Sequence, residues 1–196
     1  MIDRALAFLA AHARNATGLA TDTLTLRSAR QITDPNTPAG AYVSVVNVSE
    51  ERALRNVSHI DRTPTQTRTI EPPVHLNLDV LFAFNFADYD TSLTHLSRVI
   101  ETYQTRRFFD AATPVAPGGP VFPPELQRLV LDMANLTLEE QNNLWGTLGG
   151  AYLPSVLYRV RLVEVQGATA VPVSRIETIQ LDSSVHDPPL APGGSS

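Results

Sequence analysis

The stretch VHLNLDVLFAFNF at residues 74–86 decides the fold. In its first half apolar and polar residues alternate, with valine and leucine on one face and His75, Asn77 and Asp79 on the other. Such alternation is typical of a half-buried strand. In its second half, residues 81–86, apolar side chains fall on both faces, as they do in strands that are covered on both sides. We therefore expect a central strand here, with its far end covered.

Helical and strand patterns follow one another on both sides of this strand. Apolar residues recur at helical spacing in residues 2–16 and 91–106, which predicts two main helices, with Asp90 as the N-cap of the second. The sequence TLEE at 137–140 is a capping box that begins a third, short helix. Alternating or β-branched runs predict further strands at residues 23–28, 41–48, 108–109, 129–133 and 155–165, and a strand returning from the last of these in a hairpin at 173–181.

Together these elements predict one α+β domain over residues 1–182. Hairpins are mixed with helical crossovers, which favours a mixed, mostly antiparallel sheet with two main helices and one short helix packed on it. Residues 49–73 are charged and rich in threonine, and we expect a long exposed loop or projecting hairpin there. Residues 183–196 are rich in proline, glycine and serine, and we expect a disordered tail.

The composition excludes several classes of function. The 196 residues contain no cysteine and no lysine, so that all 15 basic residues are arginine. Without cysteine there is no disulfide framework, thiolate zinc site, iron–sulfur cluster or cysteine nucleophile. Without lysine there is no P-loop lysine and no Schiff base. The net charge of −5 argues against a nucleic-acid binder, and no apolar run reaches the length of a membrane span.

The best candidate for a catalytic or metal site is the polar face of the central strand. His75, Asn77 and Asp79 share that face, and such residues serve in metal and acid–base sites, so a hydrolase built around His75 and Asp79 stays an alternative. An alternating strand, however, ordinarily presents these residues to solvent or to an interface. The chain also has no G-x-S-x-G elbow and no glycine-rich loop before a helix. We therefore expect no enzymatic activity, no cofactor and no metal ion.

The residues that a simple core leaves unexplained are suited to an interface. Arginine pairs with carboxylates through a planar fork and loses its hydration more easily than lysine, and aromatic residues are enriched in interfaces. Four arginines lie in the segment 49–73, two more point outward on the predicted strand 155–165, and one tryptophan lies beside glycines. The candidate interface residues are Arg52, Arg55, Arg62, Arg68, Trp145, Tyr152, Arg159 and Arg161.

Several blocks of the chain resemble one known family. They are MIDRALAFL at 1–9, EE at 50–51 with LRN at 54–56, PPVHLNLDVLF at 72–82, the predicted helix at 93–104, LEE at 138–140 with NLWG at 143–146, and YLPSVLYRVR at 152–161. In this order they resemble the cap, or tail-terminator, proteins of phage-tail-like contractile injection systems. The resemblance covers about residues 1–165, except for the middle of the segment 49–73.

The resemblance implies a structural protein. Such a cap is expected to form a homohexameric ring on the distal end of the inner tube and contractile sheath, where it ends polymerisation and anchors the sheath to the tube. Its partners would be copies of itself, the sheath protein and the inner tube protein, with no nucleic acid and no membrane. Assembly would take place in the cytoplasm, and release as part of an extracellular particle stays open.

Three alternatives remain from the sequence. One is another tail-completion or connector protein of a phage, a second is the hydrolase around His75 and Asp79, and a third is a monomeric binding module. We expect the segment 49–73 to contact a neighbouring subunit or the tube.

Overall fold

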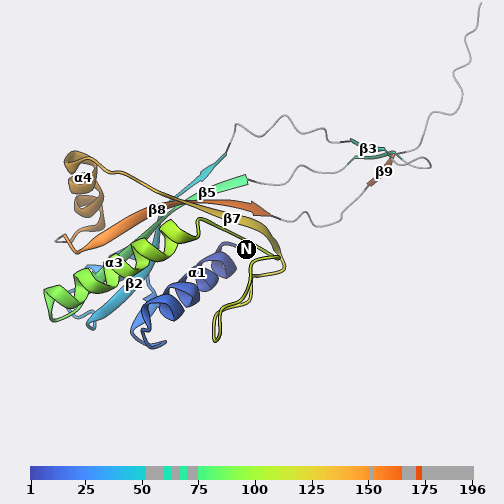
Figure 1. Ribbon diagram of the computed structural model, residues 1–196. Helices are drawn as coiled ribbons and strands as arrows, with labels where there is room; N and C mark the ends of the chain where they lie inside the picture. Colours follow the sequence, from blue (N-terminus) through green and yellow to red (C-terminus); the bar gives the residue numbers. More distant parts are fainter. Residues whose placement is uncertain (52–59, 63–66, 70–74, 151, 165–170, 174–196) are drawn as a thin grey trace, which may run out of the picture.

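Strand β5 (His75–Asn85) lies in the middle of the main sheet, as its sequence predicts. The computed structural model describes residues 1–51, 60–62, 67–69, 75–150, 152–164 and 171–173. Its main sheet has six strands in the order β1-β2-β5-β8-β7-β6 (Figure 1). The other five strands are β1 (Leu24–Leu26), β2 (Gly40–Glu50), β6 (Phe108–Asp110), β7 (Leu126–Met133) and β8 (Ser155–Glu164).

All neighbouring strands of this sheet are antiparallel except β1 and β2, which run parallel. The parallel pair is close at Gly40, where an added Cβ would lie 2.7 Å from the carbonyl oxygen of Thr23. Glycine therefore allows the hydrogen bond from the Ala41 amide to that same oxygen, at 2.7 Å. The mixed, mostly antiparallel sheet of an α+β protein is confirmed.

Two long helices, α1 (Ile2–Thr17) and α3 (Tyr89–Thr105), cover one face of the sheet (Figure 1). Their buried side chains join those of the strands in the larger core cluster, to which β5 contributes Leu78, Val80, Phe82 and Phe84. The two helices are also linked directly, because the hydroxyl of Tyr103 donates to the carbonyl of Leu9 at 3.0 Å. The helix α3 begins two residues earlier than predicted, since Asp88 and not Asp90 is its N-cap.

The opposite face carries two shorter helices, α2 (Ala29–Ile32) and α4 (Leu138–Leu148). A smaller core cluster forms there from Ile32, Tyr42, Leu81, Ala83, Trp145 and Leu157. The predicted capping box of α4 is present, with both the Thr137 and the Glu140 side chains bonded to backbone amides. The single turn α2 was not predicted, because four residues are too few for a helical period to appear.

Three short strands form a second sheet in the order β3-β4-β9. They are β3 (Ile60–Arg62), β4 (Thr67–Thr69) and β9 (Val171–Val173), paired antiparallel. The prediction that a strand beginning at Val173 returns beside β8 is wrong at that residue, since β9 pairs with β4 and the described neighbours of β8 are β5 and β7. Residues 174–196, which include the predicted tail, lie outside the described residues, as does most of 49–73.

Candidate interaction surface

The sheet face that carries α4 is divided into an apolar end and a polar end. Odd-numbered residues of β5 point to this face, so Leu81 and Ala83 contact the α4 layer. Nearer the start of the strand the same face presents Asn77 and Asp79. This polar end is the face that the sequence predicted as the best candidate for a catalytic or metal site, and in the structure it extends over four strands.

Strand register aligns a row of polar residues across the polar end. Asn47 of β2 lies opposite Asp79 of β5, which lies opposite Arg159 of β8, which lies opposite Asp132 of β7. The row depends on a bulge in β2 between Val45 and Asn47, which places Asn47 rather than Val46 opposite Asp79. We call Asn47, Asp79, Arg159, Asp132 and the adjoining Arg161 the polar row.

Asp79 is the centre of this row. Its side chain is 11% exposed and accepts at both oxygens, from Arg159 Nε at Oδ1 and from Asn47 Nδ2 at Oδ2, each at 3.0 Å. Arg161 Nη2 donates to Asp132 Oδ2 at 2.8 Å, and both of these side chains are half exposed. Both carboxylates of the row, Asp79 and Asp132, thus have a cationic partner, and the side chains of Arg159 and Arg161 remain at least half exposed.

This geometry gives no support to a hydrolase built around Asp79. A catalytic carboxylate must reach a substrate or metal ion, whereas the oxygens of Asp79 are occupied by Arg159 and Asn47. In the part of the chain that the structure describes, no three histidine, aspartate or glutamate residues lie where they could hold a metal ion together. Nor is any helix there long and apolar enough to cross a membrane.

The predicted interface residues fall into three groups. Arg159 and Arg161 lie side by side in the polar row, 58% and 50% exposed at their side chains. Trp145 is the buried residue of α4, and the more exposed Tyr152 contacts it edge-on with ring centres 5.9 Å apart. Arg62 lies in strand β3 and Arg68 in strand β4, while Arg52 and Arg55 lie outside the described residues.

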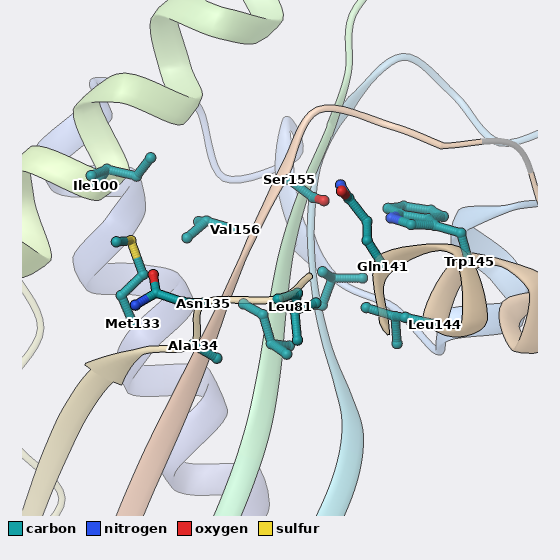
Figure 2. Close-up of a pocket in the computed structure, with 12 residues that line it drawn as sticks. Leu81, Ile100, Met133, Ala134, Asn135, Gln141, Leu144, Trp145, Ser155 and Val156 are labelled. Carbon is teal, nitrogen blue, oxygen red and sulfur yellow. The ribbon is translucent and has the colours of Figure 1, made fainter. Parts of the chain in front are cut away.

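A pocket that sequence reasoning missed lies beside α4, where that helix meets the ends of β7 and β8 (Figure 2). Its volume is about 290 Å³. Of the twelve described residues that line it, none is charged, and they are Leu81, Ile100, Met133, Ala134, Asn135, Leu136, Gln141, Leu144, Trp145, Ser155, Val156 and Leu157. The single tryptophan of the chain was the only signal of this pocket in the sequence.

One family of known proteins matches almost the whole chain. The model of the Pvc16 N-terminal domain family matches residues 2–178. A search of curated proteins found no match.

Two cryo-EM structures share the fold. The sheath/tube terminator of an extracellular contractile injection system, PVC, in its extended state matches with a TM-score of 0.58 and 16% identity, over 94% of this chain and 65% of that one. The tube-terminating cap of the anti-feeding prophage matches with a TM-score of 0.58 and 14% identity, over 92% of this chain and 59% of that one. This chain therefore spans less than two thirds of the length of either cap.

Proposed function

Because this chain belongs to the Pvc16 N-terminal domain family, we propose that it is a terminator of a contractile injection system. It caps the distal end of the inner tube and sheath, ends their polymerisation and anchors one to the other. Six copies form a closed ring, and each copy contacts its neighbours, the sheath protein and the tube protein. The ring assembles in the cytoplasm and leaves the cell with an extracellular particle.

One observation carries this proposal: two caps of such particles share the fold over more than nine tenths of this chain. The family match over residues 2–178 supports it independently. A likeness in fold alone does not define a function, but a family match and two structures that agree on the same role make the cap the best-supported reading.

The described surface also suits a cap. A ring is closed by one interface repeated around an axis, so that every subunit offers two different patches. The polar row, with the exposed side chains of Arg159 and Arg161, supplies one of them.

Deletion of the gene from its host tests the proposal. Without a cap, polymerisation has no fixed end, so electron microscopy of purified particles is expected to show tubes and sheaths of variable length, or sheaths detached from their tubes. Expression of the full chain from a plasmid should restore one length. Particles of normal, uniform length and normal contraction in the deletion strain would overturn the proposal.

A further inference from the structure

The pocket beside α4 coincides with a break in the pairing of β8. Strand β5 pairs with β8 as far as Ser155, whereas the pairing of β7 with β8 ends at Met133 opposite Tyr158. One more backbone bond follows, from the Ala134 amide to the Leu157 carbonyl at 2.9 Å. Beyond it, no described strand lies on the β7 side of Ser155 and Val156.

The backbone of Ser155 is directed towards this open side. In an antiparallel pair, successive residues direct their amide and carbonyl groups to opposite sides. The carbonyl of Pro154 accepts from the Phe84 amide of β5 at 2.9 Å, so the next residue, Ser155, directs its groups away from β5. Since Ser155 lines the pocket, the pocket contains a short free strand edge, and we call pocket and edge together the β8 slot.

The β8 slot also contains a buried donor without an acceptor. Trp145 is 4% exposed, and its indole Nε1 has no hydrogen-bond partner among the described residues. Figure 2 shows the nitrogen-bearing edge of the ring turned towards Gln141, which lines the same pocket. A buried donor left unpaired costs about 1–3 kcal/mol, so an acceptor brought into the slot would recover that free energy.

Apart from Asn135, Gln141 and Ser155, the other side chains that line the slot are apolar, and the slot reaches the surface. Leu81, Leu144 and Leu157 line its interior, and Met133 and Leu136 line it while remaining 39% and 37% exposed. Exposed apolar side chains that adjoin a pocket are typical of protein interaction sites. Because no described lining residue is charged, a charged occupant would lose its hydration without gaining an ionic partner.

We propose that the β8 slot binds an extended, uncharged, apolar segment of a partner protein. The backbone of this segment adds a short strand beside Ser155 on the side that β7 leaves free, and one of its carbonyls accepts from Trp145 Nε1. An apolar side chain of the segment fills the space between Leu144 and Met133. Strand addition draws its affinity from main-chain bonds and its selectivity from such side-chain pockets. The inference concerns binding by this slot and does not depend on the role of the chain as a cap.

The single tryptophan makes the test direct, because the full chain has one indole N–H signal in a proton–nitrogen NMR spectrum. The probe is the peptide acetyl-Thr-Val-Val-Leu-Thr-amide, and the control is acetyl-Thr-Glu-Val-Glu-Thr-amide. We expect the apolar peptide to move the indole signal downfield and to slow its exchange with water, with saturation on titration, while the acidic peptide does neither. An indole signal that the apolar peptide leaves unmoved, or that both peptides move alike, would overturn the proposal.

Two matched variants locate the binding. Leu136→Glu places a charge at the rim of the slot and is expected to weaken binding of the apolar peptide at least about tenfold. Val121→Glu changes an exposed valine that does not line the slot and should leave the affinity unchanged. Equal affinities for the two variants would count against the slot. An indole shift that follows protein concentration without peptide would identify a second copy as the occupant and would also overturn the proposal.

These results can be separated from the proposed function. If the peptide binds and the deletion strain makes normal particles, the proposal for the β8 slot stands and the proposed role as a cap is refuted. If the deletion strain makes irregular particles but no peptide moves the indole signal, the proposed role as a cap stands and the proposal for the β8 slot is refuted.

Discussion

His12 shows how burial controls the charge of a single residue. Its ring lies among Phe8, Tyr103 and Phe109, with centroid distances of 4.7–6.0 Å. Its Nδ1 is buried and has no hydrogen-bond partner among the described residues. Burial is the main cause that lowers the pKa of His12 below its ordinary value of 6.5, and the positive charge of Arg106 lowers it further. The folded protein therefore favours the neutral form of this imidazole more than the unfolded chain does.

This lowered pKa predicts a loss of stability in mild acid. Below pH 6.5 the unfolded chain binds a proton at His12 that the folded protein binds only at lower pH, so the free energy of unfolding falls as pH decreases through that window. Phenylalanine keeps the aromatic packing and cannot titrate. We expect His12→Phe to reduce the dependence of the urea unfolding midpoint on pH between about 7 and 5.

His95 provides the control for this experiment. Burial, and then Arg98, lower its pKa in the same direction, so the variant His95→Asn should remove a separate contribution. The double variant should show the weakest dependence on pH. A dependence for His12→Phe equal to that of the native chain would contradict the assignment.

At the scale of the elements, the polar row links four strands through side chains. Asp79 is the member whose loss costs most, because it is largely buried and holds both Arg159 and Asn47. Asp132 accepts from Arg161 at a similar distance but is half exposed. Water screens an exposed pair and competes for its hydrogen bonds, so the contributions of these two carboxylates to stability should differ.

Paired substitutions measure this difference. We expect Asp79→Asn to lower the free energy of unfolding by about 1–3 kcal/mol, since hydrogen bonds to a buried carboxylate are lost. Asp132→Asn should lower it by less than about 1 kcal/mol. Urea unfolding of both variants at neutral pH checks the order. Equal losses would mean that burial does not set the strength of these pairs.

At the scale of the whole molecule, the two sheet faces serve different purposes. The larger core under α1 and α3 stabilises the domain. Among the described elements, α2 and α4 pack on the other face, and α4 lies over one end of the sheet (Figure 1). The polar row lies at the other end of this face, and the β8 slot opens beside α4. A sheet arranged in this way can bind partners without losing the core that holds it together.

The arginines of residues 49–73 supply a prediction at this scale. The simultaneous change of Arg55, Arg62 and Arg68 to serine should give particles of uncontrolled length, because these cations are expected to contact a neighbouring subunit or the tube. The change of Arg4, Arg30 and Arg107, all exposed on the described surface, removes the same charge elsewhere and should leave the length unchanged. Electron microscopy of particles from complemented deletion strains measures both. Uniform particles from the first variant would refute a role of this segment in capping.

Local patterns in the sequence were enough to predict most of the elements. The alternation in residues 74–80 and the apolar run after it predicted a central strand, and the TLEE capping box predicted the start of α4, because both patterns depend on residues that are near neighbours in the chain. They failed where the signal was short or ambiguous, as in the single turn α2 and in the choice between Asp88 and Asp90 as the cap of α3.

By itself, then, the sequence determined that this protein is an α+β domain around the strand at 74–86, without cysteine or lysine chemistry. Only the tertiary structure decided that Asn47, Asp79 and Arg159 form one row, that β9 pairs with β4, and that β7 ends short of Ser155 beside the Trp145 indole. The physical reason is strand register. Register pairs Asn47 with Asp79, more than 30 positions away in the chain, and one bulge in β2 decides which side chain lies opposite Asp79. Patterns among near neighbours in the sequence contain no information about such pairing.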